Sequence, residues 1–293
     1  DPHGFRPMCL GLLDGNAYVI ASETCALDLI GANYLRDVEP GEVVFIDKNG
    51  LRSQRLPKNS RNSFCIFEFI YFARPDSNIF GQNVYLARKQ QGHEMAREYP
   101  VGADMVMPFP DSGNYAALGF AEASRIPFEM GVIRNHYVGR TFIQPTQAMR
   151  DFGVRVKLNP VRPLLSDKRL VIIEDSIIRG TTSRNRIKTL REAGAKEVHM
   201  AVSCPPHRYP CYYGIDFPTR KELVAATHSV DEIKAFLGLD SLHYLSLAGL
   251  LKAINMDTTG FCLACFTGEY PVSFPNDMHK HQLETIAKSH HGY

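Results

Sequence analysis

The chain has 293 residues, of which 44% are hydrophobic, so it can bury a sizeable core as one large domain or two smaller ones. Lysine and arginine number 33 against 31 aspartates and glutamates, and the net charge of +2 gives no bulk field to attract nucleic acid or a membrane. No stretch approaches the roughly 20 apolar residues of a membrane span, and the first residues lack a signal-peptide pattern. We therefore expect a soluble cytoplasmic protein without nucleic-acid or membrane partners.

The first 60 residues read as a β-rich unit. Short apolar runs at 17–20 and 43–46 are separated by turn pairs such as Asp14-Gly15 and Asn49-Gly50, which is typical of antiparallel strands and hairpins. The polar stretch 52–62 reads as a linker, and we place a domain boundary there. The first residue is not methionine, and we expect that upstream sequence is missing.

From residue 61 to 256 the pattern changes to apolar strands alternating with longer helical segments. Alternation of this kind predicts an α/β domain with a mostly parallel sheet, in which ligands bind beyond the carboxyl ends of the strands. The segment 131–160 is longer than most connections in compact domains, and loops of that length are often lids. A polar tail, 257–293, follows. The expected strands are 103–108, 170–173 and 198–202, and the expected helices are 115–124 and 183–193.

The most informative stretch is 170–183, a buried-strand pattern that ends in Glu174 and Asp175 and continues into Gly180-Thr181-Thr182 at the start of a helix. Two carboxylates at a strand end can accept hydrogen bonds from ribose hydroxyls and balance a positive sugar. A glycine and two threonines at a helix start can cradle a phosphate. The stretch is neither a Walker loop nor a dinucleotide fingerprint. By residue type alone, it also fits an acidic turn followed by a capped helix.

The same stretch resembles the 5-phosphoribosyl-1-pyrophosphate (PRPP) binding motif of type I phosphoribosyltransferases. Residues 71–77, 137–143 and 210–216 are similar to motifs of the amidophosphoribosyltransferase family, and the similarity runs from about the first residue to Pro271. The resemblance implies a type I phosphoribosyltransferase fold, preceded by a β-rich remnant of an N-terminal-nucleophile glutaminase domain. The family usually has two aspartates where this chain has Glu174 and Asp175, a change that keeps the charge.

The resemblance implies that ammonia displaces pyrophosphate from PRPP to give 5-phosphoribosylamine, the first committed intermediate of purine synthesis. Full-length relatives take ammonia from glutamine. Nothing in this chain matches their cysteine nucleophile, so we expect it to use free ammonia. The protein's task is then positioning and electrostatic stabilisation, and Mg²⁺ neutralises the leaving pyrophosphate.

The family pattern maps onto individual positions of this sequence. The metal-contacting positions are Ser112, Glu174 and Asp175. The catalytic positions are Glu174 and Asp175 with Arg134, Tyr137 and Arg140 of the lid. The substrate-binding positions are Asp111, Ser112, Ser176, Arg179, Gly180, Thr181 and Thr182.

The lid carries a departure from the family. The common Lys-Asn-Arg start of this loop reads Arg134-Asn135-His136 here, and a histidine loses much of its charge at neutral pH. Contact of the loop with pyrophosphate is therefore expected to be weaker. Taken singly, each basic residue of the loop also fits a solvated surface position.

Seven cysteines in a long chain without a secretory signal argue against a disulfide framework. The pair Cys262 and Cys265 alone fits zinc, redox chemistry or two idle thiols. The family resemblance adds two ligands and implies a structural, oxygen-sensing [4Fe–4S] cluster, with zinc as the alternative. The implied ligands are Cys65, Cys211, Cys262 and Cys265, and buried structural thiols are expected at Cys9, Cys25 and Cys204.

Other interpretations stay open at this stage. A nucleobase phosphoribosyltransferase would share the phosphate motif but not the lid and tail motifs. A non-catalytic PRPP-sensing regulator would need a basic DNA-reading element, for which the sequence gives no pattern. An inert fragment with exposed strands would aggregate. Relatives are commonly homotetramers, which makes a homo-oligomer the expectation. Nucleotide feedback inhibition is a further possibility, for which no binding site is assigned.

Overall fold

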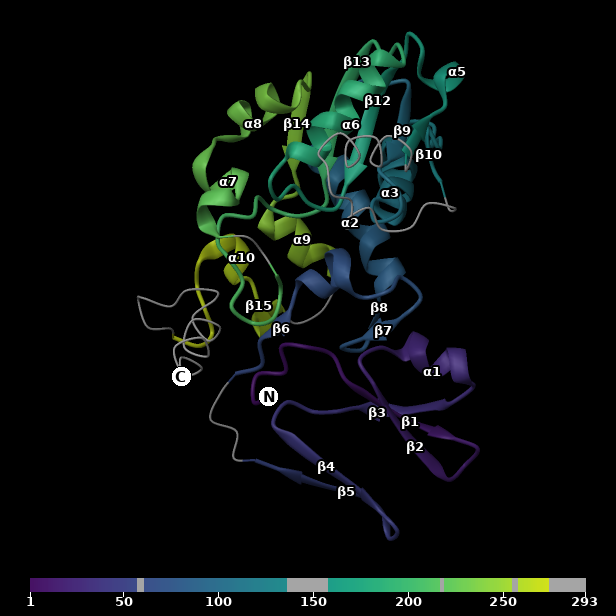
Figure 1. Ribbon diagram of the computed structural model, residues 1–293, viewed down its shortest axis with the longest axis vertical. Helices are drawn as coiled ribbons and strands as arrows, with labels where there is room; N and C mark the ends of the chain where they lie inside the picture. The colour runs from purple at the N-terminus through teal and green to yellow at the C-terminus, as the bar shows by residue number, and fades with distance from the viewer. Residues whose placement is uncertain (57–60, 136–157, 217–218, 255–257, 274–293) are drawn as a thin grey trace, which may run out of the picture.

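A computed structural model of the chain describes residues 1–56, 61–135, 158–216, 219–254 and 258–273. A β-rich N-terminal part lies below a larger α/β part in Figure 1. Among these residues, no helix combines the length and the apolar character needed to cross a membrane. The predicted domain limits at residues 60 and 256 stay predictions.

The N-terminal part is a small antiparallel sheet with a helix and a separate two-stranded ribbon. The predicted strands at 17–20 and 43–46 are confirmed, but the linker prediction is wrong over 52–55. These residues belong to a strand that pairs with its neighbour along its whole length, so the backbone is hydrogen-bonded although the polar side chains are exposed. The sheet has the order β2 (Ala17–Ala21), β1 (Cys9–Leu13), β3 (Asn33–Asp37), the helix is α1 (Thr24–Ile30), and the ribbon is β4 (Glu42–Asp47) with β5 (Gly50–Arg55).

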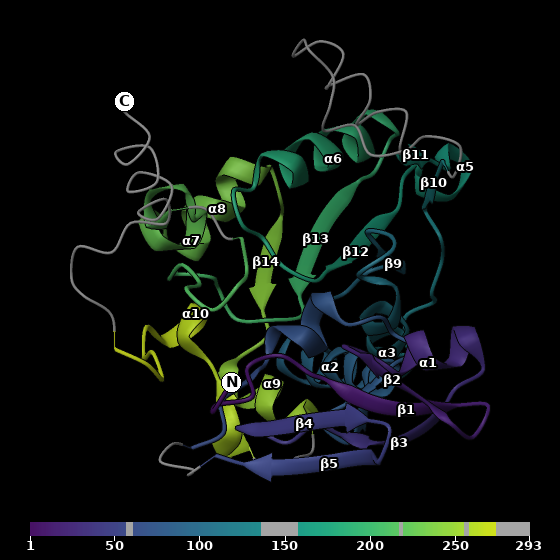
Figure 2. The ribbon, with the colours of Figure 1, turned by 60° about the horizontal axis from the view of Figure 1, so that its bottom comes forward.

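The α/β part is built on a four-stranded parallel sheet, as the alternating pattern predicts. In Figure 2, α6 and α8 lie on one side of this sheet and α2, α3 and α9 on the other. Both faces are covered, so apolar residues run without alternation, and residues 170–173 have no exposed surface. The strand order is β14 (Ser241–Tyr244), β13 (Glu197–Val202), β12 (Arg169–Glu174), β9 (Met105–Pro108), and the helices are α2 (Val84–Glu98), α3 (Asn114–Ser124), α6 (Thr181–Glu192), α8 (Val230–Leu237) and α9 (Leu247–Ile254).

Helices α2 and α3 cross closely because glycines lie at their contact. A Cβ added at Gly119 would lie 1.8 Å from the carbonyl oxygen of Lys89, and one added at Gly92 would lie 2.0 Å from that of Ala116. Only glycine fits at either position, since a backbone oxygen cannot rotate away as a side chain can.

The expected lid segment 131–160 begins and ends as strands, which the sequence pattern did not predict. β10 (Val132–Arg134) pairs antiparallel with β11 (Leu158–Pro160), and the central residues 136–157 lie outside the described part. The remaining short elements are β6 (Phe64–Cys65), the π-helix η1 (Glu68–Phe72), β7 (Asn78–Ile79), β8 (Gln82–Asn83), α5 (Arg162–Leu165), η3 (Arg220–Glu222), α7 (Val224–Thr227), η4 (Thr258–Gly260), β15 (Phe261–Cys262) and α10 (Ala264–Thr267).

Strand β6 joins three distant parts of the chain. It pairs parallel with β15, which sets Cys262 opposite Cys65. The amide of Cys65 also donates to the carbonyl oxygen of Phe5 (2.9 Å), and that of Ser63 donates to His3 (2.8 Å). The start of the chain, the beginning of the α/β part and the tail therefore meet at one strand.

Candidate functional site

Two adjacent carboxylates lie at the carboxyl end of β12, between β9 and β13. Glu174 is the last residue of the strand and Asp175 follows it, and only 8% and 6% of their surfaces are exposed. The carbonyl oxygen of Glu174 accepts a hydrogen bond from the amide of Ser203 after β13 (2.9 Å). The predicted pair is thus held at the sheet edge where α/β folds bind ligands.

Burial dominates the electrostatics of Glu174. Desolvation raises its pKa to about 8, while the nearby Arg186 opposes this shift and the charge of Asp175 adds to it. One guanidinium nitrogen of Arg186 lies 3.2 Å from Glu174 Oε1. Glu174 Oε2 is buried and accepts no hydrogen bond from the described part of the chain. A desolvated carboxylate with one open oxygen suits a cationic ligand.

Asp175 has more hydrogen-bond partners than Glu174. Burial raises its pKa, and hydrogen bonds from the hydroxyls of Ser112 and Ser176 oppose that shift. The Ser176 hydroxyl lies 2.6 Å from Asp175 Oδ1. The structure therefore brings together four of the predicted site residues, Ser112, Glu174, Asp175 and Ser176.

The turn after Asp175 has the geometry of an anion cradle. Gly180 adopts a left-handed conformation (φ 76°) directly before α6, and no side chain caps the helix. Thr181 and Thr182 are exposed in its first turn, where backbone amides have no partner within the helix. Arg179 is also exposed, and its guanidinium donates to Glu222 (2.8 Å). The turn can accept a phosphate, with Arg179 engaged beside it.

The loop after β9 faces the acids. The amide of Phe109 donates to the carbonyl oxygen of Ile173 (2.9 Å), and a Cβ at Gly113 would lie 2.3 Å from the same oxygen. This approach keeps the loop 110–113 against the end of β12. Within it, the exposed Asp111 forms an ion pair with Arg134 of β10. The other two predicted lid residues, Tyr137 and Arg140, lie outside the described residues.

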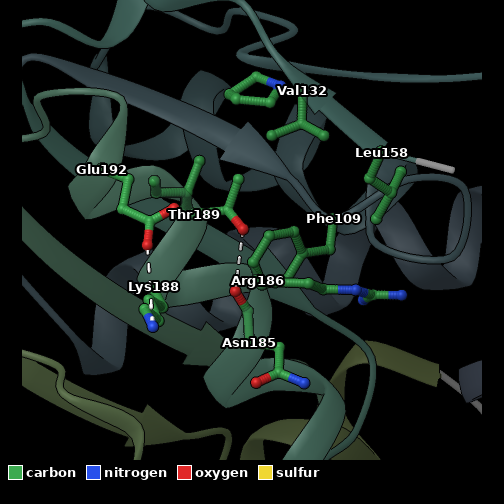
Figure 3. A pocket seen from close by; sticks show the side chains of 10 residues that line it. Phe109, Val132, Leu158, Asn185, Arg186, Lys188, Thr189 and Glu192 are labelled. Carbon is green, nitrogen blue, oxygen red and sulfur yellow. Dashed lines mark hydrogen bonds and ion pairs between the residues drawn. The ribbon is translucent and has the colours of Figure 1, made fainter. Parts of the chain in front are cut away.

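A pocket of about 130 Å³ lies next to this loop, between α6 and the β10–β11 ribbon. Figure 3 shows Arg186 of α6 beside Phe109, with Val132 and Leu158 closing the apolar side. The guanidinium carbon of Arg186 lies 5.0 Å from the centre of the Phe109 ring. Sequence reasoning missed Arg186, because a basic residue within a helix usually lies on a solvated face.

The four cysteines predicted as cluster ligands line one apolar cavity of about 20 Å³. Burial raises the pKa of the Cys65 thiol to about 12 and also raises those of Cys262 and Cys265. Negative charge on the other three sulfurs would raise the pKa of Cys265 further, in keeping with their place around the same cavity. Within the described residues, no group of three or more histidine, cysteine or acidic side chains could hold a metal ion as arranged. Cys9, Cys25 and Cys204 are buried free thiols, as predicted.

Curated proteins and solved structures similar to this chain belong to one family. No protein-family model matches the chain. The amidophosphoribosyltransferase of Bacillus subtilis is 54% identical over 281 residues, which cover 94% of this chain and 59% of that protein. The chain is a homologue of the amidophosphoribosyltransferases. A relative from Archaeoglobus fulgidus is 50% identical over 94% of this chain and 61% of its own length. A chloroplast relative from Arabidopsis thaliana is 54% identical over 93% of this chain and 48% of its own length.

Solved structures agree with this relationship. A structure described as the allosteric regulatory enzyme of purine biosynthesis superposes with a TM-score of 0.89 at 54% identity, over 95% of this chain and 61% of that one. The structure of the glutamine PRPP amidotransferase of B. subtilis, complexed with ADP and GMP, superposes with a TM-score of 0.88 at 53% identity, over 95% of this chain and 62% of that one. The predicted type I phosphoribosyltransferase fold is thereby confirmed. The chain spans about three fifths of the length of these solved homologues.

Proposed function

We propose that the chain is the transferase part of an amidophosphoribosyltransferase, which converts PRPP and ammonia to 5-phosphoribosylamine and pyrophosphate in the first committed step of purine synthesis. The observation that supports this most is the buried pair Glu174 and Asp175 at a strand end, followed by the open helix start at Gly180. This arrangement occurs in a chain 54% identical to a named amidophosphoribosyltransferase.

The proposed mechanism needs no covalent nucleophile. The two carboxylates accept hydrogen bonds from the ribose hydroxyls and balance positive charge on the anomeric carbon as pyrophosphate departs. The amides and hydroxyls from Ser176 to Thr182 hold the 5-phosphate, and the loop with Asp111 and Ser112 faces the pyrophosphate. By the family resemblance, we assign Arg134, Tyr137 and Arg140 to a lid that excludes water; Tyr137 and Arg140 lie outside the described residues.

Ser112, Glu174 and Asp175 are the proposed holders of Mg²⁺. Their oxygen donors suit this ion, and the buried Oε2 of Glu174 has no hydrogen-bond partner among the described residues. When bound, Mg²⁺ neutralises charge on the leaving pyrophosphate. Removal of Mg²⁺ with EDTA is expected to abolish PRPP binding measured by calorimetry, and binding of equal affinity in EDTA would contradict this assignment.

We also propose a [4Fe–4S] cluster on Cys65, Cys211, Cys262 and Cys265, with a structural role. Its support is the apolar cavity that all four thiols line, since soft sulfur donors suit iron–sulfur clusters. Anaerobically reconstituted protein should contain iron and sulfide, and oxidation should lower its unfolding temperature. Zinc without sulfide in that protein, or an unchanged melting curve after iron loss, would overturn the proposal.

The test of the function is pyrophosphate release with ammonia as nucleophile, compared between the parent chain and Asp175→Ala. We expect a loss of at least 100-fold, on the order of one major electrostatic contribution. The matched control is Asp231→Ala, because Asp231 pairs only with Lys234 on α8 among the interactions described. An Asp175→Ala variant as active as the parent would end the assignment.

A parallel assay with glutamine tests the nucleophile. We expect turnover with ammonia and none with glutamine, and glutamine turnover by the isolated chain would contradict this. The homologous structure that holds ADP and GMP supports a further proposal, that purine nucleotides bind this chain. Tetramer formation and a cytoplasmic location stay predictions.

A further inference from the structure

Arg186 connects two parts of the candidate site. It lies on α6, and one of its guanidinium nitrogens is 3.2 Å from Oε1 of Glu174. The same guanidinium lies over the ring of Phe109, with 5.0 Å between its carbon and the ring centre. One side chain therefore contacts both the acid at the end of β12 and Phe109, the residue directly before the loop 110–113.

The hydrogen bonds of the two acids explain why this contact matters. Asp175 receives hydrogen bonds from Ser112 and Ser176, which fix its carboxylate. For Glu174, the side-chain hydrogen bond found among the described residues is the one that Arg186 donates to Oε1, and Oε2 accepts none there. Arg186 is therefore the hydrogen-bond donor that orients the Glu174 carboxyl group among the described residues.

Neighbouring basic residues on the same helix do not share this geometry. Arg184 is exposed and lies over the ring of Phe236, 4.9 Å from its centre. Lys188 forms an ion pair with Glu192, one turn further along α6. Arg186 is thus distinguished by its place and not by its charge alone.

We infer that Arg186 is a positioning residue: it fixes the Glu174 carboxyl group through Oε1, which leaves Oε2 available when PRPP binds, and its stacking on Phe109 keeps the loop 110–113 in register with that carboxylate. The inference rests on the proposed function. The planar guanidinium of Arg186 can bind a carboxylate with its edge and an aromatic ring with its face at the same time, which the ammonium group of a lysine cannot do.

The experiment compares Arg186→Met, Arg186→Lys and the control Arg184→Met in the full chain. PRPP affinity is measured by calorimetry with MgCl₂ present, and kcat and KM by pyrophosphate release with ammonia. Partners that orient a metal or ligand-binding group are worth about 10- to 100-fold in affinity or activity, so Arg186→Met should lose that much in kcat/KM. Arg186→Lys should recover part of the loss, and Arg184→Met should match the parent.

The double variant Glu174→Gln/Arg186→Met separates positioning from a role in folding alone. If Arg186 acts through Glu174, adding Arg186→Met to Glu174→Gln should cost less PRPP affinity than Arg186→Met costs alone, because the charged partner of Arg186 is already lost and only its stacking on Phe109 remains to be removed. Full additivity would overturn the inference, as would Arg186→Met binding PRPP as tightly as the parent. A parent chain that binds no PRPP would instead overturn the proposed function, and the inference with it.

Discussion

The raised pKa of Glu174 predicts how the stability of the ligand-free, metal-free protein depends on pH. Folding raises this pKa from 4.5 to about 8 because the carboxyl group is buried. Between pH 6 and pH 8 the unfolded group is ionised while the folded group keeps its proton. The folded state is therefore favoured at the lower pH, and its advantage is lost as pH rises toward 8.

The magnitude follows from the width of this interval. Each pH unit over which only the folded group holds the proton removes about 1.4 kcal/mol. Because half of the folded molecules have already lost this proton at pH 8, the free energy of unfolding should fall by about 2 kcal/mol from pH 6 to pH 8. Urea denaturation at fixed ionic strength measures it, with Glu174→Gln as the control that cannot titrate. The parent should lose about 2 kcal/mol more than the control over this range. Parallel pH profiles of the two proteins would refute the reasoning.

Two further predictions concern stability. Gly119→Ala should lower the free energy of unfolding by about 3 kcal/mol, because its Cβ would meet the backbone of Lys89. The control is Gly102→Ala, whose Cβ would lie 3.6 Å from the nearest atom, Nη1 of Arg169, and which should change the free energy of unfolding by less than about 0.5 kcal/mol. Equal urea midpoints of the two variants would contradict the packing argument. Arg88→Met should cost about 3 kcal/mol, because this buried guanidinium donates to three backbone carbonyls of the 68–73 segment. Faster hydrogen exchange confined to that segment would locate the effect, and an unchanged urea midpoint would contradict it.

The central strand and the turn after it could be predicted because their signals are local. Residues 170–173 are continuously apolar, as a strand covered on both faces requires, and the structure buries them completely. The change to acids, glycine and threonines marks the strand end and the helix start within a few residues. Local chemistry of this kind is read directly from a sequence.

The parts that were missed depend on contacts between distant segments. β5 is polar, and its pairing with β4 holds it as a strand. β10 and β11 are three residues each, too short to show a period. Arg186 follows Glu174 by twelve residues, and only the packing of α6 on the sheet brings the two side chains together.

The meeting of three segments at β6 has a consequence for synthesis on the ribosome. The strand is made soon after the residues around Phe5 to which it bonds, but its other neighbour, β15, is made about 200 residues after it. Until then one edge of β6 is open and Cys65 lacks Cys262 opposite it. Closure of this edge thus has to wait for the synthesis of β15, and a nascent chain stalled before residue 262 keeps an unpaired strand edge that favours aggregation.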